Sequence, residues 1–198
     1  MPDFSAKALK LILDFEGLNQ PGKWPGGASG VTIGIGYDLG YVTVDQFESD
    51  WGERLQPEVR GRLKDAVGLR AVRARNRAPE FDDIRIRRIP SEEVFRERTI
   101  PLYTVRARQA FPGFDDLPLD VQGALVSLVY NRGASMVDDS PEDRRREMRA
   151  VRDAVEDEDL QEIADQLRAM KRLWVGKNLD GLLRRRDAEA ELVESAIG

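Results

Sequence analysis

The sequence of 198 residues contains neither cysteine nor histidine. These two absences exclude disulfides, thiolate nucleophiles, histidine-containing catalytic triads and the usual Cys/His zinc sites. The side chains that remain for acid–base chemistry are carboxylates, tyrosine and lysine. If the protein is an enzyme, carboxylate chemistry is therefore the leading candidate, and neither a cofactor nor a metal ion is expected.

Long hydrophobic runs are also missing. No stretch approaches the roughly 20 apolar residues that a membrane-spanning helix needs. Residues 1–5 show no basic segment followed by an apolar one, so we expect synthesis in the cytoplasm without a signal peptide. The net charge of −5 argues against a general nucleic-acid-binding protein. The length suits a single compact domain with a real core.

The first helix is predicted from a cap and an apolar period. Ser5 is a suitable N-cap, and apolar residues then recur at helical spacing until Glu16. Gly17 is expected to end this helix as its C-terminal cap. Glu16 therefore lies in the last turn, on or beside the apolar face.

A loop and a strand are predicted next. Residues 19–30 are rich in glycine and proline and predict turns throughout. Residues 31–37 alternate β-branched residues with glycine, which predicts a strand with close backbone approach. This strand carries Thr32, and Asp38 follows it directly.

The rest of the chain predicts helices, with one segment of a different kind. The segment 70–90 is rich in arginine and poorly periodic, so we expect an irregular connection with a salt-bridged surface, rather than a nucleic-acid site. The strongly apolar helix over 118–131 is expected to be the central one. The other predicted helices span residues 43–55, 57–68, 91–110, 140–155, 159–173 and 180–196.

Glu16 and Asp38 form a candidate catalytic pair. A lone glutamate at a helix end is most often a surface residue, but an apolar face beside Glu16 would raise its pKa and keep it protonated as a general acid. Two carboxylates that flank one bond are what glycoside hydrolysis requires, and Thr32 could hold the attacking water by its hydroxyl. A carboxyl separation of about 6.5–9.5 Å would indicate inversion and one of about 5 Å retention, and sequence spacing leaves both open.

Several segments resemble parts of the phage-type lysozymes, the muramidases that open bacterial peptidoglycan. Residues 15–17 and 31–38 are similar to their catalytic signature, in which a Glu-Gly at the end of the first helix precedes a Thr-Ile-Gly-x-Gly strand. Residues 124–133 resemble their core helix. Residues 181–189, preceded by Trp174, resemble their closing Gly-Leu-x-x-Arg-Arg-x-x-Glu helix.

The resemblance implies an α+β, lysozyme-like fold. We expect a single domain over residues 1–198, with a small β-containing N-terminal lobe at about 15–60. A larger helical lobe, at about 91–198 together with the helix 5–16, would face it across a cleft.

One departure from the family points to a subtype. Phage-type enzymes usually place their catalytic aspartate between the Glu and the Thr, but residues 17–31 contain no acidic residue. Asp38 instead follows Thr32 by six residues, as in the lysozyme domain of the bacteriocin pesticin. The resemblance therefore implies Glu16 as general acid, Thr32 as the water-positioning residue and Asp38 as base or electrostatic stabiliser.

Further site residues follow from the same comparison. Arg185 matches an arginine that lies near the catalytic glutamate in the family; it would favour the ionised carboxylate, so the sign of the net pKa shift of Glu16 stays open. Asn131 matches an amide that can contact sugar, although a helix cap is an equal alternative. Trp24 and Tyr37 are candidates for stacking on sugar rings, with loop and core packing as the alternative.

The expected activity is hydrolysis of the β-1,4 bond between N-acetylmuramic acid and N-acetylglucosamine, which would lyse bacterial cell walls. A lytic transglycosylase or chitosan hydrolase is an alternative, as are a non-catalytic glycan-binding module and a helical protein-interaction domain. The expected binding partner is peptidoglycan. We expect the protein to be a monomer and to bind no nucleic acid. A phage endolysin released by a holin and an antimicrobial toxin delivered by a secretion system both fit, and only a toxin would need an immunity protein.

Overall fold

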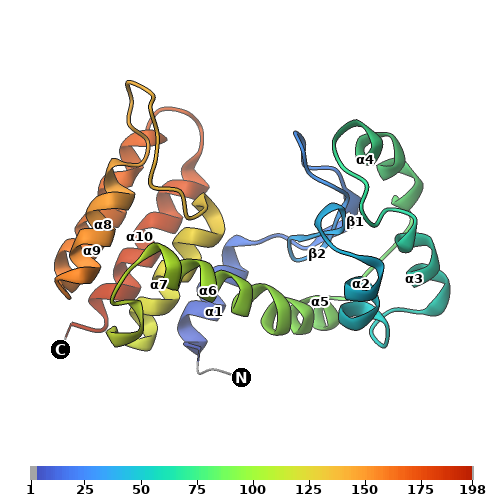
Figure 1. Ribbon diagram of the computed structural model, residues 1–198, viewed down its shortest axis with the longest axis horizontal. Coiled ribbons are helices and arrows are strands. Elements are labelled where there is room, and N and C mark those ends of the chain that lie inside the picture. The colour runs from blue at the N-terminus through green and yellow to red at the C-terminus, as the bar shows by residue number, and fades with distance from the viewer. Residues whose placement is uncertain (1–3, 198) are drawn as a thin grey trace. The chain divides into compact units, whose positions relative to one another are not determined.

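The computed structural model describes residues 4–197, apart from the side chains of residues 19–21. Residues 1–3, on which the expected lack of a signal peptide partly rests, therefore lie outside the described residues. The architecture is α+β, with many helices and one three-stranded antiparallel sheet, as expected (Figure 1). Within the described part, no helix is both long enough and apolar enough to cross a membrane.

The chain divides into two compact units. The sheet unit is the continuous segment Glu16–Pro101, and the helical unit combines Met1–Phe15 with Leu102–Gly198. The expectation that both make up one lysozyme-like domain stays a prediction.

The sheet unit contains all three strands and several short helices. Its elements are β1 (Asn19–Lys23), β2 (Thr32–Gly34), β3 (Tyr37–Asp38), η1 (Leu39–Tyr41), α2 (Val44–Trp51), α3 (Pro57–Lys64), α4 (Ala71–Arg77), η2 (Ala78–Phe81), α5 (Arg88–Val94) and η3 (Phe95–Thr99). The strands pair in the order β1-β2-β3. The core beneath them is built from aromatic and aliphatic side chains, among them Val31, Ile33, Leu39, Phe47, Trp51, Leu63, Phe81 and Ile86.

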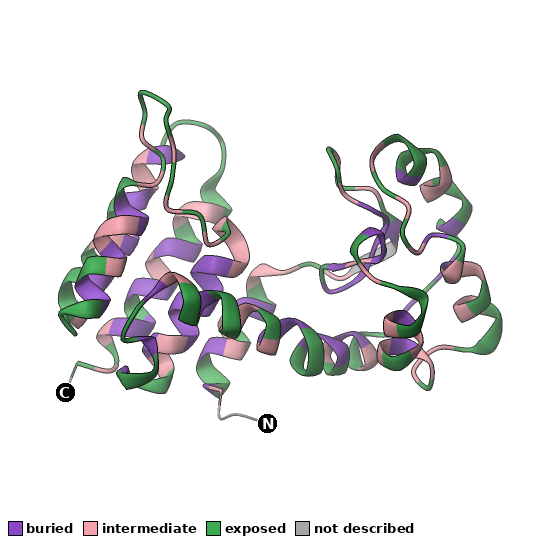
Figure 2. Cartoon of the chain, in the orientation of Figure 1, coloured by how far each residue is buried: buried purple, intermediate pink, exposed green. Residues whose placement is uncertain are grey.

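The helical unit is built around one buried helix. Its elements are α1 (Ala6–Phe15), α6 (Ile100–Ala110, except its first two residues), η4 (Phe114–Asp116), α7 (Leu119–Arg132), α8 (Arg146–Glu156), α9 (Leu160–Ala169), η5 (Met170–Leu173) and α10 (Asp180–Glu194). In α7, Val121 and residues 123–129 are all buried, and α1 and α10 pack against it (Figure 2). The predicted central helix is thus confirmed.

Local capping explains where several helices begin. The Oγ atom of Ser5 accepts the N–H of Ala8 at 3.1 Å and starts α1. Thr43 caps α2 through the N–H of Gln46, and Asp159 caps α9. Each such bond satisfies an N–H that has no partner inside the helix. These three starts agree with the sequence prediction.

The segment around the first two strands differs from the prediction. Residues 19–23 form β1, where turns were expected throughout, because its backbone pairs with β2. The predicted strand 31–37 is instead a tight hairpin of β2 and β3. Gly34 and Gly36 have positive φ there, a conformation that glycine adopts without strain. α1 ends at Phe15, and Gly17 lacks the left-handed conformation expected of its cap.

Three later predictions were also wrong. The segment 70–90 is not irregular, because α4, η2 and the start of α5 lie within it and Ala74, Phe81, Ile84 and Ile86 bury their side chains in the core.

α8 begins at Arg146 and not at residue 140. The helix predicted from residue 91 begins earlier, with α5 at Arg88, so Ser91 lies inside it and its hydroxyl donates to the carbonyl of Arg87 at 3.0 Å.

Candidate functional site

The β2–β3 hairpin brings Thr32 and Asp38 together. The two residues are direct partners in the antiparallel register, one on each strand. Directly opposed residues of an antiparallel pair have their side chains on the same face, with Cβ atoms about 4.5–5.5 Å apart. Thr32 is buried and Asp38 half-buried. A hydroxyl and a carboxylate predicted to act on one water molecule are therefore neighbours.

The carboxylate of Asp38 also fastens a loop. Its Oδ1 atom accepts the N–H of Gly30 at 2.9 Å and that of Gly40 at 2.8 Å, and its Oδ2 atom lies 3.2 Å from the Gly30 nitrogen. The bond from Gly40 caps the short helix η1. Asp38 thus holds the end of the Gly/Pro-rich loop against the end of the hairpin.

Glycine is required at both positions that contact this carboxylate. A Cβ atom on Gly30 would lie 2.3 Å from the Gly40 nitrogen and 2.4 Å from Oδ1 of Asp38. A Cβ atom on Gly40 would lie 2.6 Å from the carbonyl oxygen of Leu69. Backbone packs directly on backbone here, which leaves no room for a side chain.

The environment of Asp38 increases its affinity for a proton. Burial raises the pKa of this carboxyl, and the N–H groups of Gly40 and Gly30 and the positive charge of Arg70 only partly oppose that shift. The net effect is a pKa above the usual range of an aspartate. When ionised, Asp38 is therefore a stronger base than an exposed aspartate.

Glu16 occupies the joint between α1 and the first strand. It is half-buried, directly follows Phe15 at the end of α1, and is the first residue of the sheet unit. Three residues further on, Asn19 begins β1 opposite Gly34 of β2. All three predicted catalytic residues therefore belong to the sheet unit.

Arg185 is buried on α10 in the helical unit. Its Nη2 atom donates to Oγ of Ser127 at 3.1 Å, and its Nε atom lies 3.3 Å from Oε1 of Glu189. Its guanidinium carbon lies 5.8 Å from the ring centroids of both Phe15 and Tyr130, within cation–π range. Arg185 therefore packs against the last residue of α1, which immediately precedes Glu16.

Glu189 is the acceptor at the centre of this buried cluster. Its Oε1 atom accepts the hydroxyl of Ser127 at 2.6 Å and Nη2 of Arg186 at 2.7 Å. Burial lowers the pKa of Arg186, and the charge of Glu189 opposes that shift. Arg185 and Arg186 are both buried although Arg184 beside them is exposed, a distinction that the run of three arginines did not reveal.

The three predicted sugar-contacting residues have different surroundings. Asn131 is half-buried and its Oδ1 atom accepts a long bond of 3.4 Å from Arg186. Trp24 is half-buried and donates its indole N–H to the carbonyl of Ser29 at 3.1 Å.

Tyr37, the third, is only 5% exposed, and its ring meets that of Trp51 edge-on at 5.5 Å. Its hydroxyl donates to Asp50 at 2.7 Å, and burial raises the pKa of that hydroxyl. This environment matches the core-packing alternative for Tyr37.

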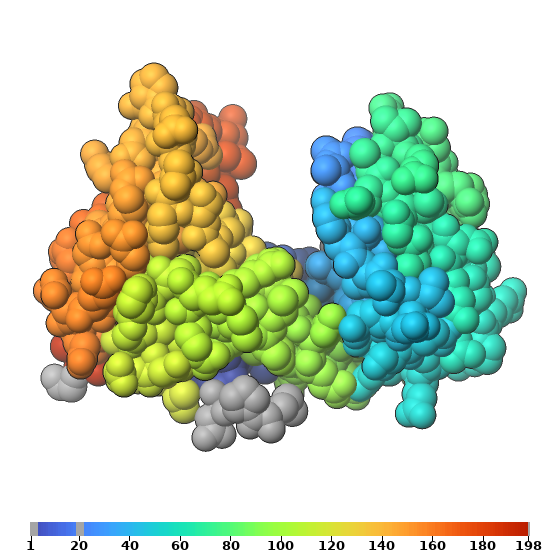
Figure 3. All heavy atoms as spheres, in the orientation of Figure 1, coloured from blue at the N-terminus to red at the C-terminus, as the bar shows by residue number. Residues whose placement is uncertain are grey.

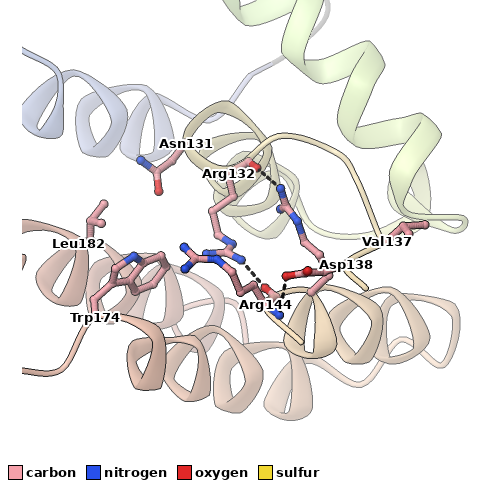
Figure 4. A pocket seen from close by; sticks show the side chains of 8 residues that line it. Asn131, Arg132, Val137, Asp138, Arg144, Trp174 and Leu182 are labelled. Carbon is pink, nitrogen blue, oxygen red and sulfur yellow. Dashed lines mark hydrogen bonds between the residues drawn. The ribbon is translucent and has the colours of Figure 1, made fainter. Parts of the chain in front are cut away.

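A pocket of about 430 Å³ lies entirely within the helical unit, between the end of α7, the loop that follows it, and α10 (Figure 4). The loop, residues 133–145, runs from the yellow to the orange part of the surface in Figure 3. The residues that line the pocket are Asn131, Arg132, Val137, Asp138, Arg144, Arg145, Trp174 and Leu182. Of these lining residues, only Asn131 was predicted as a site residue. The sequence feature that could have indicated the pocket is the run of arginines at 144–146.

Comparison with known proteins found one family. The sequence model of the family described as Phage lysozyme matches residues 114–189, which lie wholly in the helical unit. The match includes Asn131 and the buried cluster on α10, and it begins after Glu16, Thr32 and Asp38. A search of curated proteins found no match. The match covers less than half of the chain, and it shows that residues 114–189 are similar to part of the phage lysozymes.

Proposed function

We propose that this protein is a peptidoglycan hydrolase, a muramidase that cleaves the β-1,4 bond between N-acetylmuramic acid and N-acetylglucosamine. The observation that carries the proposal is the match of residues 114–189 to the Phage lysozyme family. The predicted catalytic segment lies outside that match, so its support comes from local geometry: Thr32 and Asp38 are register partners on the hairpin.

In the proposed mechanism, Glu16 acts as the general acid and protonates the leaving glycosidic oxygen. Asp38 acts as the base, and Thr32 orients a water molecule beside it. The pKa of Asp38 is raised by burial, which strengthens it as a base once it is ionised. The two N–H groups that bind Oδ1 hold the carboxylate in one orientation, so that it needs little reorganisation during the reaction.

Arg185 is proposed as a positioning residue. It packs against Phe15 and is itself anchored by Ser127 and Glu189, so it fixes the end of the helix from which Glu16 follows. Asn131 is the proposed sugar contact of the helical unit, because its side chain lines the pocket. Trp24 is proposed to contact sugar from the Gly/Pro-rich loop, since its half-buried ring is held by Ser29.

The closest enzymatic alternative is a lytic transglycosylase, which works with one glutamate. The placement of Asp38 beside Thr32 favours the hydrolase, because a transglycosylase needs no activated water. The pesticin-like subtype is part of the proposal for the same reason: the aspartate follows the strand, and residues 17–31 contain no other carboxylate.

The test is the clearing of permeabilised Gram-negative cells, followed by mass spectrometry of the released fragments. Glu16→Gln and Asp38→Asn should each reduce clearing at least about a hundredfold, since general acid–base groups typically contribute 10²–10⁴. Asp14→Asn is the matched control, because Asp14 is an exposed carboxylate of α1 that pairs with Lys10.

Reducing muramic ends in the products would support the hydrolase, and anhydro-muramic ends would replace it with the transglycosylase. If the folded wild-type protein binds the wall without clearing cells, the protein is a glycan-binding module. Circular dichroism of each variant separates loss of chemistry from loss of fold.

A further inference from the structure

The pocket of the helical unit is lined by three arginines and a single acidic residue, Asp138. The carboxylate of Asp138 is already engaged, since it accepts the backbone N–H of Ser140 and that of Arg144, each at 2.9 Å. These N–H groups lower the pKa of Asp138, so the group stays ionised and tied to its own loop. Its one negative charge therefore offsets one of the three arginine charges, and the lining keeps a positive excess.

The arginines donate mainly to backbone carbonyls. Arg132 donates to the carbonyl of Arg144 at 2.5 Å, and Arg145 donates to the carbonyl of Arg132 at 2.9 Å (Figure 4). Among the residues that the structure describes, neither Arg132 nor Arg145 forms an ion pair with a carboxylate. In the same part of the chain, Nε of Arg132 and Nη1 of Arg145 are buried without a hydrogen-bond partner. Such groups in a native structure call for an explanation, of which a bound ion is one.

The charge of these arginines is concentrated, and it is compensated only in part by Asp138 and by Glu142, which pairs with Arg144 at 3.4 Å. The pKa of Arg132 is lowered to about 10, first by burial and then by repulsion from Arg145, Arg186 and Arg144. The helical unit as a whole is nevertheless acidic. The sheet unit contains equal numbers of acidic and basic residues, so the whole net charge of −5 belongs to the helical unit. A cationic pocket in an otherwise acidic unit attracts anions locally and is typical of an anion-binding site.

We propose that this pocket binds an oxyanion, a carboxylate or a phosphate, carried on a ligand with an apolar or sugar face. Arginines suit this role because their planar N–H groups match the oxygens of both anions. Trp174 supplies the second half of the site: its ring lies 5.0 Å from the guanidinium carbon of Arg132, and Leu182 lines the same wall. The site stands whether or not the protein hydrolyses peptidoglycan.

The indole N–H signal of Trp174 reports on this site by ¹H–¹⁵N NMR, and it is distinguished from those of Trp24 and Trp51 through Trp174→Phe. The probes are inorganic phosphate, N-acetylmuramic acid and N-acetylglucosamine, which has the same ring without the carboxylate, all at constant ionic strength in chloride. A saturable shift of Trp174 with phosphate or N-acetylmuramic acid, and none with N-acetylglucosamine, is the expected result. Tighter binding of phosphate would favour a phosphate-bearing ligand, and tighter binding of N-acetylmuramic acid a carboxylated glycan.

Arginine variants test whether the NMR shift of Trp174 depends on the arginines of the pocket. Arg145→Gln should weaken binding about tenfold or more, the typical effect of losing a charged hydrogen-bond donor. Arg144→Gln serves if the first variant does not fold, and Arg152→Gln is the control, since Arg152 pairs with its neighbour Asp153 away from the pocket. The absence of any saturable shift of Trp174, or equal affinity in the wild-type protein and the folded arginine variants, would overturn the proposal.

Discussion

Asp38 combines an electrostatic role with a structural one in a single side chain. Both of its short hydrogen bonds end on Oδ1, so an asparagine could keep them while it removes the charge. Asp38→Asn is therefore a near-isosteric change that separates the charge of this residue from its contribution to the loop. Asp38→Ala removes both and should destabilise the protein by about 1–3 kcal/mol, because two buried N–H groups lose their acceptor.

The raised pKa of Asp38 predicts how stability depends on pH. The folded state binds this proton more tightly than the unfolded state, so the resulting stabilisation is fully present below the ordinary carboxyl pKa and is lost as pH rises through the raised value. Asp38→Asn has no such proton. The melting temperature of the wild-type protein minus that of the variant should therefore fall between about pH 3 and pH 7. A difference that grows with pH would mean that the N–H groups of Gly30 and Gly40 outweigh burial.

Gly30 provides a second test at this scale. Gly30→Ala forces a Cβ atom into the Gly40 backbone and the Asp38 carboxylate, so we expect a loss of about 2 kcal/mol or more in the free energy of unfolding. Gly61→Ala is the matched control in the same unit, since open space surrounds that position in α3 and alanine favours helix. Urea denaturation measures both, and equal stability of the two variants would contradict the close packing at Gly30.

At the scale of elements, the crossing of α1 and α7 depends on one glycine. A Cβ atom on Gly123 would lie 2.1 Å from the Cβ atom of Ala8. Gly123→Ala should therefore lower the free energy of unfolding by about 1–3 kcal/mol despite its better helix propensity. In the double variant with Ala8→Gly the methyl group only changes sides, so most of that loss should be recovered. Additive effects in this cycle would show that the two helices do not approach as closely as described.

A substitution in the buried cluster of α10 should have a larger effect on stability. Glu189→Gln removes the carboxylate that contacts both Arg185 and Arg186, and breaking a buried ion pair from one side typically costs about 3–5 kcal/mol. Glu191→Gln on the exposed face of the same helix is the control, with an expected change within about 0.5 kcal/mol. Thermal unfolding compares the two, and similar melting temperatures would mean that the arginines find other acceptors.

Sequence reasoning succeeded at several helix starts, missed other local signals such as the expected cap at Gly17, and failed most clearly where packing decides. The caps at Ser5, Thr43 and Asp159 depend on neighbouring residues, and all three were predictable. The strand at residues 19–23 and the buried helices of 70–90 depend on partners distant in sequence, which override a turn-like or arginine-rich composition.

The candidate site shows the same limit. The residue types of Glu16, Thr32 and Asp38 were available from the sequence, but the pairing of the last two depends on the hairpin register. The role of Asp38 in binding Gly30 and Gly40 was invisible, because its acceptor bonds follow from the closed loop.

At the scale of the whole molecule, the charge distribution predicts how the proposed hydrolase responds to salt. The net charge of −5 belongs to the helical unit, and bacterial walls are themselves anionic, so the two should repel each other at low ionic strength. Raising salt from about 10 mM to 150 mM shortens the Debye length from about 30 to 8 Å, which should speed the clearing of cells.

The control is the same salt series with walls whose carboxylates have been amidated, where little change is expected. Clearing that slows with salt on native walls would instead mean that cationic patches such as the arginine-lined pocket dominate the encounter. In that case Arg145→Gln should weaken the salt dependence, because it removes one of the three arginine charges of the pocket.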